Sequence, residues 1–216
     1  MTFTHLHVAS GYSLRHGAST PAALVARAAE LGMDALALTD RDGCYGAVKF
    51  ATACAAVGID PLLGVDLAHE PSGLLQGLPA WADPSAGAGA AGGTSGRRSP
   101  ARGGGQVDPR HPRVTVLALA ADVGTGLPSA AGWAQVCRLV SATHARGTRG
   151  RPVATEELVA AHAVDTSGVS GTTRDTGERG TGAPALAVLL GPHSEVGRAV
   201  LARRDDLAVA LLRRWQ

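Results

Sequence analysis

Aromatic residues are scarce in this sequence. Phe, Trp and Tyr together make up only 3% of the 216 residues, whereas all hydrophobic residues reach 45%. This hydrophobic fraction is close to that of globular proteins, which argues against a fully disordered chain. The core must therefore be built mainly from Ala, Val and Leu, which bury less area per residue than aromatic side chains. The length fits one domain, with or without a tail.

Cysteine is also rare, and its spacing excludes two common roles. The chain has three cysteines, Cys44, Cys54 and Cys137, and no Cys-x-x-Cys pair. An odd and widely spaced set predicts neither a disulfide framework nor a zinc finger, and it is typical of a reducing compartment. The first residues do not show a basic segment followed by an apolar run, so a signal peptide is not expected. We therefore expect a cytoplasmic protein.

Long apolar runs and strong net charge are absent too. No apolar stretch approaches the roughly 18 residues that a membrane-spanning helix needs, so we expect no membrane partner. The net charge of +2 is too small to predict nucleic-acid binding by itself. The sequence also lacks a Walker A phosphate loop and a Gly-x-Gly-x-x-Gly motif after a strand, which excludes the common nucleotide-binding loops.

The first third of the chain alternates between strand-like and helix-like patterns. The expected strands and helices of this block, residues 1–67, are strands at 3–8, 35–40 and 59–67 and helices at 19–32 and 46–57. Pro21 follows two residues that favour helix caps, Ser19 and Thr20, and so marks the start of the first helix. Strands alternating with helices at this spacing predict parallel strands joined by helical crossovers.

Low-complexity stretches interrupt the rest of the chain. Residues 84–106 contain no Val, Ile, Leu, Met or aromatic residue, so they cannot bury enough apolar area to offset the entropy of ordering. The predicted order is a flexible insertion at 68–112, a central block at 113–163, a flexible loop at 164–182 and a last block at 183–216. The ordered blocks carry predicted strands at 113–119 and 185–190 and helices at 132–144, 152–162 and 194–216.

Side chains able to bind metals or move protons fall at the carboxyl ends of the first three predicted strands. These residues are His7, Asp40 and Asp66. Functional residues of parallel sheets and barrels gather at that edge. Imidazole and carboxylate groups suit zinc and manganese, and two such metals can activate water and hold a phosphate. His5 and His7 would also share one face of a strand, because side chains repeat every two residues.

The segments around these residues resemble the polymerase-and-histidinol-phosphatase (PHP) domain. The likeness is carried by His5-Leu-His7-Val-Ala9-Ser10-Gly-Tyr12-Ser13, by residues 35–50 with Thr39-Asp40-Arg41, and by Leu63-Gly64-Val-Asp66. Residues 135–152 and 189–192 agree with later parts of the same domain. Within the family, the sequence is most similar to the start of bacterial DNA polymerase III alpha subunits, especially the error-prone type.

The resemblance implies both a fold and a function. The fold is an α/β, distorted (β/α) barrel of the PHP type with parallel strands, here incomplete and carrying two flexible insertions. The function is that of the N-terminal part of an error-prone DNA polymerase III alpha-like protein, which acts in DNA synthesis and repair. Its partners would be DNA, the remaining polymerase domains or replication proteins. The polymerase aspartates lie in a later domain and the final Asp-x-His motif would follow position 216, so no polymerase activity is expected from this chain.

The sequence departs from the family pattern at the expected metal ligands. The family's His-x-His pair aligns with positions 7 and 9, and Ala9 cannot ligate a metal. Arg41 stands where a histidine is usual, and its fixed positive charge would repel a metal. Asp66 replaces what is more often Glu. Arg41 could instead pair with Asp40 or Asp66 and so put an internal ion pair in the place of a metal.

We therefore expect a remnant metal site made of His5, His7, Asp40 and Asp66. No catalytic residue and no cofactor is assigned; an active site of this type would use a divalent metal, Zn, Mn or Mg. Two alternatives remain open at this point. A free-standing PHP phosphoesterase or 3′–5′ exonuclease would hold bound metal. A non-enzymatic docking module for a polymerase would expose an apolar patch where barrel strands are missing.

Overall fold

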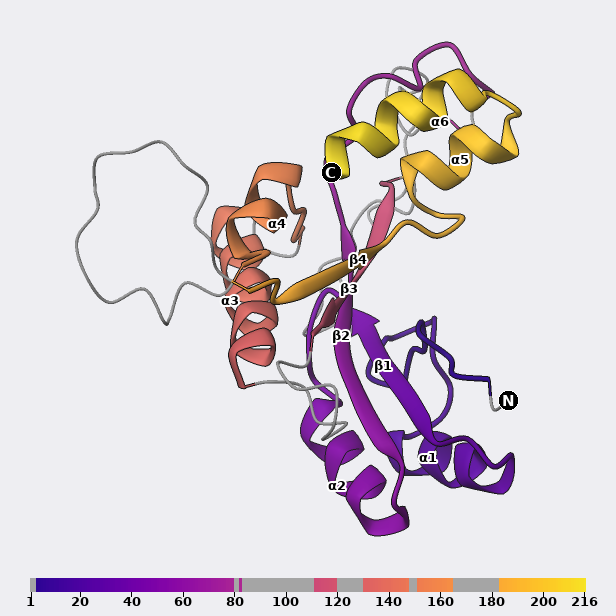
Figure 1. The fold of residues 1–216 in the computed structure, drawn as a ribbon, viewed down its shortest axis with the longest axis vertical. Helices are drawn as coiled ribbons and strands as arrows, with labels where there is room; N and C mark the ends of the chain where they lie inside the picture. The colour runs from indigo at the N-terminus through magenta and orange to yellow at the C-terminus, as the bar shows by residue number, and fades with distance from the viewer. Residues whose placement is uncertain (1–2, 80–81, 83–110, 120–129, 148–150, 165–182) are drawn as a thin grey trace, which may run out of the picture. The chain divides into compact units, whose positions relative to one another are not determined.

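The chain is described from a computed structural model, which covers residues 3–79, 82, 111–119, 130–147, 151–164 and 183–216. The low-complexity stretch at 84–106 and all of the predicted 164–182 loop except Val164 lie outside these described residues. The fold is mixed α/β (Figure 1). No helix within these ranges combines the length and the hydropathy that crossing a bilayer requires.

The strands form one sheet with the order β1-β2-β3-β4. Their bounds are Ala35–Arg41 for β1, Asp60–Ala68 for β2, Arg113–Ala118 for β3 and Leu186–Leu189 for β4. Strands β1 and β2 are parallel, in a register that sets Leu38 beside Leu63 and Arg41 beside Asp66. The parallel pairing predicted for these two strands is confirmed. Within the described residues the sheet does not close on itself.

The helices follow the predicted pattern except at the end of the chain. They are α1 (Pro21–Glu30), α2 (Ala47–Val57), α3 (Ala130–Arg146), α4 (Glu156–His162), α5 (Glu195–Leu201), α6 (Asp205–Leu212) and the 3-10 turn η1 (Arg213–Trp215). The prediction of one continuous C-terminal helix is wrong. Arg203 has a φ of 55°, in the left-handed region that a helix cannot continue through, so α5 ends before α6 begins.

The N-terminal segment runs beside β1 without forming the regular strand predicted at 3–8. The backbone N–H of Ala37 donates to the carbonyl of His5 at 2.9 Å, and that of Thr39 donates to Val8 at 2.8 Å. Between these two bonds the chain advances by two residues along β1 and by three along the segment. The extra residue bulges, with a bend at Leu6, and interrupts the ladder.

The described chain divides into two compact units, each with its own core. The first unit comprises residues 1–66, 116–140 and 159–188, and the second comprises 67–115, 141–158 and 189–216. In the first unit, α1 and α2 contact each other and pack on the sheet through Leu38, Leu63 and Phe50 (Figure 1). Thr20 caps α1, because its hydroxyl accepts the Ala23 N–H at 3.2 Å.

The second unit is built around the α5–α6 pair, whose helices lie side by side (Figure 1). Its core contains Ala199, Ala208 and Leu211 together with Leu75, which is 1% exposed. Leu75 and Ala68 both fall in the region predicted as a flexible insertion. The structure instead places Ala68 in β2 and packs Leu75 against the two helices.

Candidate functional site

Asp40, near the end of β1, is enclosed by hydrogen-bond donors from the N-terminal loop. Its side chain is 1% exposed. Oδ1 accepts from the Ser10 N–H at 2.7 Å and from the Ser13 hydroxyl at 2.7 Å. The Ser10 hydroxyl lies 2.9 Å from both Oδ1 and Oδ2. Both carboxylate oxygens thus receive protein donors, which compensates for the loss of water around a buried charge.

The loop that supplies these donors is itself tightly wound. The Ser13 hydroxyl accepts the Arg41 N–H at 2.9 Å, and the Ser10 hydroxyl accepts the Tyr12 N–H at 3.2 Å. Gly46 closes the other side, since a Cβ built there would lie 2.7 Å from Asp40 Oδ2. Helix α2 therefore starts directly against the carboxylate.

Arg41 and Asp66 meet at the ends of β1 and β2. Arg41 Nε lies 3.8 Å from Asp66 Oδ2, and the two side chains are 24% and 7% exposed. Arg41 Nη1 also lies 3.1 Å from His16 Nδ1. The Asp42 N–H donates to the Asp66 carbonyl at 2.9 Å, which extends the contact between the two strand ends. One of the two pairings expected for Arg41, the one with Asp66, is thus present as a contact.

Asp40 and Asp66 point to opposite faces of the sheet. The register pairs Asp40 with Val65 and Arg41 with Asp66. Because side chains alternate along a strand, Asp40 shares the face of Leu38, which packs against α1 and α2, and Asp66 takes the other face. The two carboxylates expected in one remnant site are therefore not brought together around a common point.

The two candidate histidines lie on the N-terminal segment and are exposed. The His5 ring contacts the Phe3 ring edge-on, with centroids 4.8 Å apart. Within the described ranges, no three His, Cys, Asp or Glu side chains are grouped as metal ligands would be. His5 and His7 therefore join neither Asp40 nor Asp66 in such a group.

Cys44 lies in the loop between β1 and α2, close to Asp40. Burial, together with the nearby Cys137 and Asp40, raises the pKa of its thiol to about 12. A thiol with this pKa stays protonated at neutral pH, so it is a poor nucleophile. Cys44 packs against the core of the first unit.

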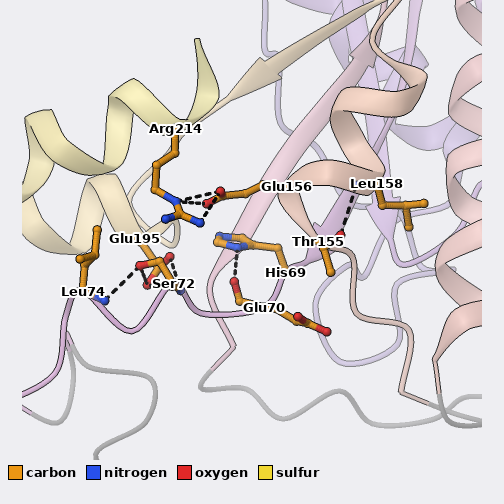
Figure 2. Close-up of polar contacts among 9 residues, drawn as sticks. All are labelled: His69, Glu70, Ser72, Leu74, Thr155, Glu156, Leu158, Glu195 and Arg214. Atoms are coloured by element: carbon orange, nitrogen blue, oxygen red, sulfur yellow. Dashed lines mark hydrogen bonds and ion pairs between the residues drawn. The ribbon is translucent and has the colours of Figure 1, made fainter. Parts of the chain in front are cut away.

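A second polar cluster, which sequence reasoning missed, lies in the second unit (Figure 2). Glu195 at the start of α5 is 3% exposed, and its carboxylate accepts the Ser72 N–H at 3.0 and 3.1 Å and the Ser72 hydroxyl at 3.0 Å. Burial raises the pKa of Glu195, and the bonds from Ser72 act against that rise. These residues are 123 positions apart, so no local pattern could have paired them.

The same cluster contains a bidentate ion pair. Arg214 Nε lies 2.9 and 2.8 Å from the two carboxylate oxygens of Glu156, and Nη2 lies 2.8 Å from Oε2 (Figure 2). Thr155 caps α4 beside it, because its hydroxyl accepts the Leu158 N–H at 3.2 Å. The ion pair ties α4 to the C-terminal turn η1.

His69 completes the cluster as a buried neutral imidazole. Its side chain is 1% exposed, and its Nδ1 lies 2.9 Å from the Glu70 carbonyl, to which Nδ1–H donates (Figure 2). Nε2 has no hydrogen-bond partner, and the Trp215 ring packs edge-on at 5.6 Å. Burial lowers the pKa of His69 to about 4, helped by the nearby positive charge of Arg198. His69 falls within the flexible insertion predicted at 68–112, and no local sequence pattern indicates that its side chain is buried.

Comparison with known proteins gives a family match over almost the whole chain. The model of the family described as "PHP domain" matches residues 5–216. The error-prone DNA polymerase of Corynebacterium efficiens is 54% identical over 65 residues, which cover 30% of this chain and 6% of the relative. DNA polymerase III subunit alpha of Treponema pallidum is 48% identical over 71 residues, or 33% and 6% of the two chains. The matched segments span about 6% of the length of these relatives.

Among solved structures, an amidohydrolase from Chromobacterium violaceum with bound sulfate and no metal is similar to this chain. The identity is 23%, and the similarity covers 77% of this chain and 51% of that one. The TM-score is 0.33.

Proposed function

This chain belongs to the PHP domain family, and from that premise we propose that it forms the N-terminal PHP portion of an error-prone DNA polymerase III alpha-like protein. The observation that carries the proposal is the 54% identity to an error-prone DNA polymerase over 65 residues. The 48% identity to a polymerase III alpha subunit over 71 residues supports the same assignment. Its role would lie in DNA synthesis and repair, with DNA and the other polymerase domains as partners.

The fold we propose is an incomplete, distorted (β/α) barrel of the PHP type. The parallel β1–β2 pair with its crossover helix α2 supports this architecture. The open order of the described sheet, from β1 to β4, is what an incomplete barrel would leave. The cytoplasm remains the proposed location, because the cysteine pattern suits a reducing compartment.

We propose further that the PHP site of this chain is degenerate and that the chain alone is not a catalyst. A two-metal phosphoesterase needs clustered imidazole and carboxylate ligands. Here Ala9 offers a methyl group, Arg41 brings a positive charge to 3.8 Å from Asp66, and Asp40 already accepts hydrogen bonds from Ser10 and Ser13. These residues do not fit a catalytic metal cluster, so no step is assigned to a metal.

The test of this proposal is a nuclease assay on the purified 216-residue chain. The substrates are single-stranded and primed DNA, and a phosphomonoester serves to detect hydrolysis of small substrates. We expect no nucleotide release above an EDTA control with Mn²⁺, Zn²⁺ or Mg²⁺. Manganese-stimulated release that His7→Ala abolishes, and that the control substitution His193→Ala of another exposed histidine leaves intact, would overturn the proposal of a degenerate site.

The polymerase assignment has a separate test in the DNA that follows this coding sequence. We expect that DNA to encode the polymerase domain with its catalytic aspartates, in the same or another reading frame. A downstream region without any such sequence would count against the assignment and favour the free-standing phosphoesterase or the docking module. The nuclease assay then separates those two, because only the phosphoesterase would hydrolyse its substrate.

A further inference from the structure

We infer that the two carboxylates of the PHP site act as metal-independent anchors of the fold: Asp40 holds the loop of residues 9–19, and Asp66 holds Arg41 at the end of β1. The inference rests on the proposed function in one respect only, that the site binds no catalytic metal. These two side chains have a structural role in place of metal binding. The residues at this site do not match the ligands that a catalytic metal cluster needs.

The Asp40 carboxylate accepts hydrogen bonds from several protein donors. One backbone N–H and two hydroxyls donate to its oxygens at 2.7 to 2.9 Å. The carboxylate is 1% exposed, so these protein donors take the place of water. Hydrogen bonds to an ionised group are among the stronger ones in proteins. The donors that would compete with a metal for Asp40 are therefore supplied by Ser10 and Ser13.

The serines that donate to Asp40 belong to one loop, which is closed by hydrogen bonds of its own. The Ser13 N–H donates to Ser10 at 2.8 Å, and the N–H groups of His16 and Gly17 both donate to Ser13 at 2.9 Å. The Gly11 N–H donates to Ser19 at 2.7 Å and so joins the two ends of the loop. A contact between Asp40 and these serines therefore holds the whole turn, not two isolated side chains.

The sheet separates the two carboxylates. Asp40 and Asp66 lie on opposite faces, as the register of β1 and β2 requires. On its own face Asp66 has a guanidinium beside it, with Arg41 Nε at 3.8 Å. Arginine cannot lose its charge at physiological pH, so this counter-charge is permanent. Each carboxylate is thus balanced on its own face without a shared ion.

The expected consequence is that the folding stability of the chain does not depend on divalent metal. Thermal unfolding of the full chain, followed by circular dichroism at pH 7, should give the same midpoint in EDTA, Mn²⁺ and Zn²⁺. Asp40→Asn should lower the midpoint equally in all three, because the amide NH₂ would face the serine donors. The matched control is Asp60→Asn, the same change at an exposed residue of β2, and it should leave the midpoint unchanged.

A second variant keeps the test sharp if Asp40→Asn does not fold. Ser13→Ala removes one donor to Asp40 and the acceptor of the Arg41 N–H. It should lower the midpoint by less than Asp40→Asn does, again without any effect of metal. An unchanged midpoint in Ser13→Ala would overturn the inference.

Metal dependence would overturn it as well. A rise in the wild-type midpoint with Mn²⁺ or Zn²⁺ that Asp40→Asn or Ser13→Ala abolishes would show that Asp40 serves a metal site. Such a rise without nucleotide release would sink the anchor role and leave the polymerase assignment standing. Nucleotide release with a metal-independent midpoint would sink the degenerate-site proposal and, with it, the premise of this inference.

Discussion

Gly46 lacks a side chain at the point where α2 begins against the Asp40 carboxylate. A Cβ at this position would lie 2.7 Å from Asp40 Oδ2 and 3.2 Å from the Ser10 hydroxyl, so Gly46→Ala has to push the carboxylate or the helix aside. Overpacking of this kind costs about 1–3 kcal/mol in the free energy of unfolding. Urea denaturation of the full chain measures it.

Gly191→Ala is the matched control for that substitution. No atom lies within 4 Å of a Cβ built at Gly191, so the same chemical change meets open space there. We expect its free energy of unfolding to stay close to that of the wild type. An equal decrease in the free energy of unfolding of Gly46→Ala and Gly191→Ala would show that the close approach to Asp40 does not affect stability.

His69 makes the stability of the chain depend on pH. Its pKa falls from 6.5 in the unfolded chain to about 4 in the folded one, because burial disfavours the charged ring. Between these values the unfolded state binds the proton more tightly, so stability is lost as the pH falls from about 6.5 towards 4. Linkage gives a loss of about 2 kcal/mol between pH 7 and pH 5.

Urea denaturation of wild type and His69→Gln at pH 7 and pH 5 checks this expectation. The variant lacks the titrating ring, so its loss between the two pH values should be smaller than that of the wild type. Glu195, whose pKa is raised by burial, acts in the opposite direction but does so in both proteins. His193→Gln, at an exposed histidine, should keep the wild-type dependence. If the free energy of unfolding falls equally between pH 7 and pH 5 in wild type and His69→Gln, the pH dependence does not come from His69.

The sequence indicated where the candidate side chains lie along the strands but not which face of the sheet each one takes. Asp40 and Asp66 do lie near the ends of β1 and β2, because strand ends can be read from a hydrophobic pattern, whereas His7 lies on a segment that forms no regular strand. Which face each side chain takes depends on the register between β1 and β2, which tertiary packing decides. The pattern therefore could not show that Asp40 turns towards α1 and α2 while Asp66 turns away.

Helix α1 depends on its first turn, where Thr20 supplies the cap. The hydroxyl accepts the Ala23 N–H, which otherwise has no partner within the helix. Thr20→Ala should lower the free energy of unfolding by about 1 kcal/mol, and Thr20→Ser should restore most of it. Ser19→Ala is the neighbouring control, because Ser19 accepts through its carbonyl and keeps it. Urea denaturation of the three variants measures the ranking, and a Ser19→Ala loss equal to that of Thr20→Ala would contradict it.

Most helices and strands could be predicted because their signals are local. Pro21 after a cap residue begins α1, and Gly58 in a left-handed conformation ends α2. The two failures have non-local or subtle causes. The break at Arg203 needs a positive φ from a residue that rarely adopts one. The bulge opposite Ala37 and Thr39 depends on how the N-terminal segment meets β1.

At the scale of the whole molecule, the two units follow from contacts between distant parts of the chain. The second unit joins residues 67–115, 141–158 and 189–216. Contacts of this range carry no periodic signal, and residues 68–79 were included in the predicted flexible insertion at 68–112. Leu75 and Ser72 are nevertheless held by α5 and α6, which lie more than a hundred residues later.

Glu195 provides a test of whether the second unit loses its structure separately from the first. Glu195→Ala removes the acceptor of the Ser72 N–H and hydroxyl and leaves a backbone donor without its partner. Such a loss costs about 1–3 kcal/mol. Hydrogen exchange of the full chain should then show faster exchange in α5, α6 and residues 72–78, with smaller changes in α1, α2 and β1. This difference is expected because the helices of each unit pack around separate cores.

Asp206→Ala is the control for this experiment, because it removes an exposed carboxylate from the same helix pair. Asp206 pairs with Arg204 beside it at the start of α6, with oxygens 2.9 and 2.7 Å from the guanidinium nitrogens. An exposed pair of this kind contributes little to stability, so exchange should stay near the wild-type rates. If Glu195→Ala instead speeds exchange equally in α5 and α6 and in α1, α2 and β1, the two sets of elements lose their structure together, and the expectation of separate unfolding is wrong.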